Sequence, residues 1–246
     1  MEKKHCTAVV LAAGSGKRMG TAVHKQYLLI DEKPVLYYSL RAFQDSELIN
    51  EIILVTGREE EEYCRSQIVD AYGISKVTKI VAGGRERYHS VWNGLQAVRQ
   101  AGYVYIHDGA RPFVDEEMIR RAYECVKKES ACAAGMPVKD TIKIVDEKGF
   151  VEETPERSRV WLVQTPQVFN TDLVIHAYAL LMEKEKAVQE SSEKDTGENI
   201  VVTDDAMVVE QMTGHPVRLF EGAYENIKIT TPEDLETAEV FLKRRC

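Results

Sequence analysis

The chain has 246 residues, of which 44% are hydrophobic and 29% charged, and its formal net charge is −8 at pH 7. This acidic balance disfavours a protein that coats nucleic acid or binds a membrane surface, since both functions need basic surface, and no apolar run approaches the roughly 18 residues of a membrane span. The five cysteines are scattered without a CxxC pair, which disfavours structural zinc and a disulfide framework. We therefore expect a cytoplasmic protein whose residues 1–246 form one domain.

Short apolar runs alternate along the chain with segments whose apolar residues recur every three or four positions. The predicted strands are 7–11, 51–55, 77–81, 103–106, 132–136 and 217–219. The predicted helices are 35–43, 59–72, 91–100, 116–128 and 172–184. Strands that alternate with helices form βαβ crossovers, so the pattern predicts an α/β fold with a mainly parallel sheet and helices on both faces. Ligands of such sheets bind beyond the carboxyl ends of the strands.

Two segments interrupt this alternation. Residues 140–155, DTIKIVDEKGFVEETP, alternate apolar and polar side chains around DEKG, which predicts a β-hairpin. Because its apolar positions have no core beneath them, we expect the hairpin to project as an arm at about 138–158 and to meet a partner surface. Residues 183–199, EKEKAVQESSEKDTGEN, are polar and low in complexity, which predicts a mobile surface loop.

The first predicted strand runs directly into a glycine-rich loop, VVLAAGSGKRMG. The loop is not a Walker A motif, because leucine and arginine replace the first glycine and the last serine or threonine that the motif requires. It is not a dinucleotide fingerprint either, because it has one residue too many between its glycines. Gly14 and Gly16 still allow backbone N–H groups to approach an anion closely. Arg18 can bind phosphate oxygens with two parallel bonds, and Lys25 adds a compact charge. The loop favours phosphate binding, and the alternative is a glycine-rich turn with solvated basic residues.

Further motifs follow this loop in a fixed order. They are GGRERYHS (83–90), HDGARP (107–112), PVKDTIK (137–143), TPQ (165–167) and NIKITTPEDL (226–235). Together, and over nearly the whole chain, the set resembles the 2-C-methyl-D-erythritol 4-phosphate cytidylyltransferase family, which catalyses the CTP-dependent step of the non-mevalonate isoprenoid pathway. The resemblance implies a Rossmann-like nucleotidyltransferase fold and a homodimer formed through the β-arm.

Matched position by position, the resemblance implies three groups of site residues. The catalytic residues, which act on the triphosphate and the reacting phosphates, are Arg18, Lys25 and Lys228. The CTP-binding residues are Ala12, Ala13, Gly14 and Gly16 in the first loop, Gly83, Gly84 and Ser90 at the cytosine, and Asp108, Gly109 and Ala110 at the ribose. The polyol phosphate site is lined by Arg111, Thr141, Arg157, Thr165, Thr203 and Thr230, with Thr141 and Arg157 contributed by the second subunit. We expect Mg²⁺ as cofactor, held mainly by triphosphate oxygens, and no dedicated metal ligands in the protein.

Several of these residues have simpler interpretations. His107 is interpreted as a structural residue at a strand end rather than a base, and Asp108 can instead cap the turn that follows it. Arg111 can be a solvated turn residue, and Lys228 a surface lysine at a strand end. Arg159 lies two residues from Arg157 and can take over the role assigned to it.

Two positions depart from the usual family pattern, and two other functions stay open. His24 stands where the family usually has proline, and Arg85 stands where its members often carry an acidic residue, so we assign no contact to Arg85. The nearest alternative function is that of a ribitol 5-phosphate cytidylyltransferase, because the motifs fit either polyol phosphate. The other alternative is a non-catalytic nucleotide-binding regulator with the same fold. The intact basic residues argue against this alternative.

Overall fold

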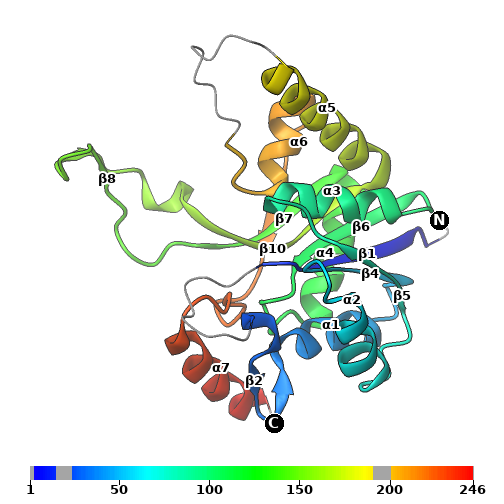
Figure 1. Cartoon of the computed structure of the whole chain (residues 1–246). Helices are drawn as coiled ribbons and strands as arrows, with labels where there is room; N and C mark the ends of the chain where they lie inside the picture. Colours follow the sequence, from blue (N-terminus) through cyan, green and yellow to red (C-terminus); the bar gives the residue numbers. More distant parts are fainter. Residues whose placement is uncertain (1–2, 15–23, 191–200, 246) are drawn as a thin grey trace.

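A seven-stranded sheet forms the centre of the molecule in the computed structural model, which describes residues 3–14, 24–190 and 201–245 (Figure 1). The strand order is β11-β7-β10-β6-β1-β4-β5. These strands are β1 (His5–Ala12), β4 (Glu51–Thr56), β5 (Val77–Ala82), β6 (Gly102–Asp108), β7 (Ala131–Pro137), β10 (Trp161–Asn170) and β11 (Arg218–Glu221). All six predicted strands are present, each within a few residues of its predicted bounds.

The sheet is mainly parallel, as the sequence predicts. Strand β1 pairs in parallel with both β4 and β6, β4 does so with β5, and β7 with β11. Strand β10 is the exception, since it runs antiparallel between β6 and β7. This strand was not predicted, because Pro166 interrupts its apolar run and proline rarely continues a strand. The structure accommodates Pro166 where the pairing with β7 shifts register between Val163 and Gln167.

Helices cover both faces of the sheet (Figure 1). They are α1 (Val35–Asp45), α2 (Glu61–Tyr63) with the π-helical turn η3 (Cys64–Asp70), α3 (Arg87–Ala97), α4 (Glu116–Glu129), α5 (Thr171–Glu190), α6 (Asp205–Thr213) and α7 (Pro232–Arg245). One core packs α1, η3 and α4 against the sheet, and a second packs α3, α5 and α6 against its opposite face. Among the described helices, none combines the length and apolar character that crossing a bilayer requires.

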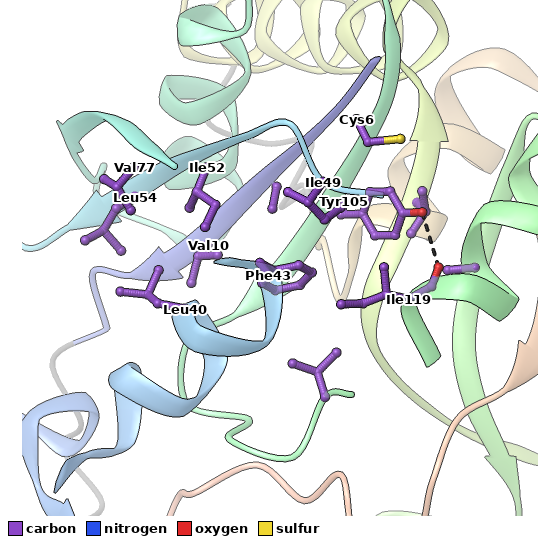
Figure 2. Packing of buried hydrophobic residues seen from close by; sticks show 14 of the residues in the cluster. Cys6, Val10, Leu40, Phe43, Ile49, Ile52, Leu54, Val77, Tyr105 and Ile119 are labelled. Atoms are coloured by element: carbon purple, nitrogen blue, oxygen red, sulfur yellow. Dashed lines mark hydrogen bonds between the residues drawn. The ribbon is translucent and has the colours of Figure 1, made fainter. Parts of the chain in front are cut away.

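Alternation along β1 explains how one strand serves both cores. Val10 faces the first core and the adjacent Val9 the second, as expected from the two-residue period of a strand. In the first core, Phe43 of α1 packs edge-on against Tyr105 of β6 (Figure 2). The Tyr105 hydroxyl donates to the Ile119 carbonyl at 3.3 Å, so this large buried ring retains a hydrogen bond.

A third, smaller cluster joins the C-terminal helix to the first part of the chain. It contains Ile30, Val35, Phe113, Ile229 and Ala238. The short antiparallel pair β2 (Leu29–Ile30) and β3 (Lys33–Pro34) follows the helical turn η2 (Lys25–Tyr27) here. Helix α7 was not predicted, although its sequence has proline at the first position, acidic residues in the first turn and basic residues in the last.

The predicted arm is present as a hairpin that projects away from the sheet (Figure 1). Its antiparallel strands are β8 (Ile144–Val145) and β9 (Val151–Glu153), and the 3-10 turn η4 (Arg157–Arg159) leads back into β10. The Asp146 carboxylate accepts the N–H groups of Lys148 and Phe150, which closes the turn.

The prediction of a loop over residues 183–199 is wrong for its first half. Helix α5 continues to Glu190, so residues 183–190 are helical, and residues 191–199 lie outside the described residues. Two features stabilise this extension. Its residues are good helix formers, and Glu185 accepts a hydrogen bond from Tyr88 at 3.0 Å and lies 2.8 Å from His89 Nε2.

Candidate active site

The carboxyl ends of β1 and β6 lie side by side at the centre of the sheet. Leu11 is paired with Asp108, and the Gly109 N–H donates to the Leu11 carbonyl at 2.8 Å. A Cβ atom at position 109 would lie 2.9 Å from that carbonyl oxygen, so the close approach requires glycine. Asp108 is therefore held beside the carboxyl end of β1.

A cavity of about 360 Å³, called here the first cavity, opens beyond these strand ends. Nine of the residues predicted from the sequence line it: Ala12, Ala13, Gly14, Lys25, Gly84, Ser90, Asp108, Ala110 and Lys228. Gly83 lines a neighbouring cavity beside Ala13, and Gly109 packs against Leu36. Gly16 and Arg18 fall within 15–23, outside the described residues. The structure thus brings together loops that are more than 200 residues apart in the chain.

The loop between β5 and α3 is shaped by its own side chains. Ser90 accepts the Gly84 N–H at 3.0 Å and donates to the Glu86 carbonyl at 3.3 Å. Glu86 and His89 form a capping box, so α3 begins at Arg87 rather than at residue 91 as predicted. A Cβ atom at Gly84 would collide with His89, which explains the second glycine of the pair.

A cluster of positive charges surrounds Asp108, which lines the first cavity. The Asp108 carboxylate lies 2.7 Å from Lys228 Nζ, 3.2 Å from Arg87 Nε and 3.8 Å from Arg111 Nε. Burial raises the pKa of Asp108, but the charges of Arg87, Lys228 and Arg111 outweigh it and hold that pKa well below its ordinary value. Asp108 is therefore ionised near neutral pH.

A second cavity of about 300 Å³ adjoins the first. Its lining is Arg87, Asp108, Arg111, Val163, Gln164, Thr165, Gln167, Thr203, Asp204 and Lys228. Three of these residues, Arg87, Asp108 and Lys228, also line the first cavity. These three residues, here called the shared wall, form a charged boundary that the two cavities have in common. Such an arrangement can bring two anionic ligands into contact at the boundary.

His107 lies beneath the shared wall and is buried completely. Its Nε2 donates to the Arg111 carbonyl at 3.1 Å, and its Nδ1 accepts from the Thr165 hydroxyl at 3.1 Å. Thr165 in turn accepts the Asp108 N–H at 3.0 Å. Burial lowers the pKa of His107 to about 4, so the ring is neutral near pH 7 and both nitrogens are occupied. This agrees with the interpretation of His107 as structural.

Comparison with known proteins identifies the family. The model of the 2-C-methyl-D-erythritol 4-phosphate cytidylyltransferase family matches residues 6–244. The chain belongs to this family. It is 49% identical over 237 residues to the enzyme of that name from Lachnospira eligens, covering 96% of this chain and 99% of the relative. The relative from Lachnoclostridium phytofermentans is 45% identical over 243 residues, covering 99% and 97%.

Solved structures of the cytidylyltransferase family have the same fold. The 4-diphosphocytidyl-2C-methyl-D-erythritol synthase of Anaerococcus prevotii superimposes with a TM-score of 0.80 at 32% identity, over 99% of this chain and 100% of that one. The Thermus thermophilus cytidylyltransferase superimposes with a TM-score of 0.73 at 28% identity, over 96% and 98%. These matches confirm the nucleotidyltransferase-like α/β fold predicted from the sequence.

Three residues assigned to the polyol site by family resemblance do not line either cavity of this chain. Thr141 is exposed on the arm, and Arg157 is exposed at its base, where Nη1 donates to the Lys139 carbonyl at 3.3 Å. The Thr230 hydroxyl donates to Asp234 at 2.8 Å. Of the remaining polyol-site residues, Arg111, Thr165 and Thr203 do line the second cavity.

His24, which departs from the family pattern, contacts an acidic residue. His24 Nδ1 lies 2.6 Å from Glu60, and the Tyr27 hydroxyl donates to the same carboxylate at 2.8 Å. These two residues flank Lys25 along η2. Glu60 therefore anchors the turn from which Lys25 enters the first cavity.

Sequence reasoning missed Arg87 and the residues at the start of α6. Arg87 lies within the motif GGRERYHS, but only its glycines and serine were assigned a role. Asp204 lies in VVTDDA, where it caps α6 by accepting the Met207 N–H at 3.0 Å, and it also lines the second cavity. An acidic residue directly before a helical apolar pattern is a recognisable start signal, so this helix could have been found from the sequence.

Proposed function

We propose that this protein transfers CMP from CTP to 2-C-methyl-D-erythritol 4-phosphate. The products are 4-diphosphocytidyl-2-C-methyl-D-erythritol and pyrophosphate, and the reaction is the CTP-dependent step of the non-mevalonate isoprenoid pathway. The observation that carries this proposal is the shared wall between two cavities, because it supports a nucleotide bound in one cavity and a polyol phosphate bound in the other, with their phosphates meeting at the wall. Membership of the family supports methylerythritol phosphate over ribitol 5-phosphate as the substrate.

In the proposed reaction an oxygen of the polyol phosphate attacks the α-phosphorus of CTP. A new P–O bond forms as the bond from the α-phosphorus to the bridging oxygen breaks, and pyrophosphate leaves with that electron pair. A phosphate monoester is already largely dianionic near pH 7, so the reaction needs no general base. This fits a site in which His107 is neutral with both nitrogens bonded and Asp108 is ionised.

The main obstacle to this reaction is repulsion between two polyanions, which cationic side chains offset by positioning and electrostatics. Lys25 enters the first cavity, on the nucleotide side. Lys228 lies in the shared wall and can reach phosphates on both sides. We assign Lys25 and Arg18 to the triphosphate and Lys228 to the reacting phosphates.

Mg²⁺ is proposed as the cofactor. Among the described residues, no three His, Cys, Asp or Glu side chains gather into a group that could hold a metal ion. We infer that the ion arrives with the nucleotide and is held mainly by its triphosphate oxygens, which are ligands of the kind that Mg²⁺ prefers. When bound, Mg²⁺ would neutralise part of the triphosphate charge.

We further propose that the protein works in the cytoplasm as a homodimer, and the arm supports the dimer. Its apolar side chains are exposed in the single chain, among them Phe150 at 70% and Val151 at 57%. A second copy of the chain would cover them, as exposed apolar patches often mark interfaces. Thr141 and Arg157 would then reach the polyol phosphate site of the partner.

The experiment that tests the function is pyrophosphate release with purified protein, CTP and Mg²⁺. We expect rapid release with 2-C-methyl-D-erythritol 4-phosphate and at least about 100-fold lower kcat/KM with ribitol 5-phosphate, since a site that hydrogen-bonds the hydroxyl groups of one polyol leaves polar groups unpaired when the other binds. Faster turnover of ribitol 5-phosphate would reassign the substrate. No release with either polyol phosphate would favour the nucleotide-binding regulator.

A further inference from the structure

Arg87 occupies the boundary between the two cavities but belongs to neither of the residue sets expected to bind substrates. It is the first residue of α3, so its backbone position is set by the capping box of Glu86 and His89. Its side chain is 30% exposed and lines both cavities. One of its N–H groups, Nε, donates to Asp108 at 3.2 Å.

The two terminal nitrogens of the Arg87 guanidinium bind Asp205. Two parallel hydrogen bonds of 2.8 Å each join Nη1 and Nη2 to the two carboxylate oxygens. Asp205 is completely buried, and the Tyr178 hydroxyl donates to it at 2.5 Å. A planar guanidinium held by two parallel bonds has a fixed direction, so Asp205 determines where Nε of Arg87 points.

Asp205 also belongs to the polyol side of the site. It is the first residue of α6, directly after Thr203 and Asp204, which line the second cavity. Arg87 follows the loop that contains Gly84, which lines the first cavity. The Arg87–Asp205 pair therefore connects the segments that form the two cavities, although the two residues are 118 positions apart.

The charges around Asp108 show what this connection does. Three cations face the Asp108 carboxylate: Arg87 from α3, Arg111 from the loop after β6 and Lys228 from the segment before α7. His107 precedes Asp108 on β6, and Asp205 of α6 pairs with Arg87. Arg87 and Lys228 contact different carboxylate oxygens. Without Arg87, Asp108 could rotate about its side-chain bonds and carry Lys228 with it.

We propose that Arg87 is a positioning residue for the transfer reaction, and that Asp205 directs it. Through Arg87, Asp205 fixes the Asp108 carboxylate, and Asp108 holds the Lys228 ammonium group at the boundary between the cavities. The inference rests on the proposed function, because the role of Arg87 is defined by the step in which both phosphates meet at Lys228.

The test compares four variants with wild type in kcat, in KM for each substrate, in melting temperature and in the pH dependence of kcat. For Arg87→Gln we expect kcat to fall at least about 100-fold, as for other losses of positioning, with both KM values within about fivefold. For Asp205→Asn, which retains the Arg87 charge, we expect a fall of at least about tenfold. Arg87→Lys should give a kcat between those of Arg87→Gln and wild type.

Glu185→Gln is the matched control. It removes a carboxylate that bonds to Tyr88 and His89, the residues directly after Arg87 on α3, yet it lines neither cavity. We expect its kcat to stay within about twofold of wild type. An equal loss of kcat in Glu185→Gln and Asp205→Asn would show that both act only by anchoring α3, and would overturn the proposal.

The pH profile separates positioning from a merely structural role. Removing the Arg87 charge raises the pKa of Asp108 toward its unpaired value, so kcat of Arg87→Gln should decline at a higher pH on the acid side than kcat of wild type. An unshifted acid limb, or a kcat of Arg87→Gln within threefold of wild type, contradicts the proposal. If Arg87→Gln does not fold, two other variants test the proposal: a lower kcat in Asp205→Asn than in Glu185→Gln supports it, and an equal kcat contradicts it. Absence of turnover in wild type would instead refute the proposed function.

Discussion

At the scale of single residues, removal of the Lys25 side chain should affect catalysis strongly and stability little. It lines the first cavity from a three-residue helical turn rather than from the core. We expect Lys25→Ala to lower kcat/KM at least about 100-fold, which corresponds to about 2.7 kcal/mol of lost transition-state stabilisation. The melting temperature should change little.

Lys33→Ala is the control for this variant. Lys33 is also a partly buried lysine near the start of the chain, but it lines neither the first nor the second cavity. Steady-state kinetics should show near-normal turnover for Lys33→Ala. Near-normal turnover for Lys25→Ala as well would remove Lys25 from the triphosphate site.

His107 should make the stability of the protein depend on pH in a defined range. Burial lowers its pKa in the folded protein to about 4, from the ordinary histidine value of 6.5. Between these values the unfolded chain binds more protons than the folded one, so the free energy of unfolding falls as the pH drops from 6.5 toward 4. A single group contributes a slope of at most about 1.4 kcal/mol per pH unit.

Denaturant unfolding at several pH values measures this contribution. The pH slope of the unfolding free energy in this range should be smaller for His107→Gln than for wild type, even if the variant is less stable throughout. His176→Gln controls for the loss of an exposed histidine on α5. The same slope in His107→Gln and wild type would show that His107 is not the group responsible.

At the scale of elements, the arm is expected to carry residues into the site of a second subunit. If Arg157 acts in the partner's site, then mixing Arg157→Ala with Lys25→Ala produces hybrid dimers with one complete site out of two. Random exchange makes half of the dimers hybrids, so activity should recover to about one quarter of wild type. The control is each variant mixed with itself, which should recover nothing.

Differently tagged subunits show whether hybrids form in this mixture. If hybrids are isolated and have no more activity than the parent variants, Arg157 acts in its own subunit or not at all. Elution of the wild-type chain as a monomer at assay concentration would also count against the shared site.

Most elements follow from local sequence, and the exceptions have identifiable causes. The six predicted strands and the hairpin depend on apolar periodicity and turn residues, which a sequence displays directly. Strand β10 escaped prediction because its pairing tolerates Pro166 only at a shift of register. The end of α5 was not predicted, because contacts between Glu185 and two residues far away in the sequence, Tyr88 and His89, stabilise this polar segment as a helix.

At the scale of the whole molecule, the order of the strands assembles the site. Strands β1 and β6 are neighbours in the sheet, so the motifs that follow them meet, as is general for parallel sheets. The residues that line the first cavity were mostly predictable for this reason and from the family motifs. The Arg87–Asp205 pair was not, because no local pattern reveals a hydrogen bond between residues 118 positions apart.

The central claim is that the two substrates meet at the shared wall of Arg87, Asp108 and Lys228. A crystal structure of the protein with 4-diphosphocytidyl-2-C-methyl-D-erythritol tests it most directly, since this product joins the cytidylyl group of CTP to the polyol phosphate in one molecule. The account predicts cytidine in the first cavity, the polyol in the second, and the diphosphate at the wall with an oxygen within hydrogen-bond distance of Lys228 Nζ. A product bound with its diphosphate away from Lys228, or with both ends in one cavity, would contradict it.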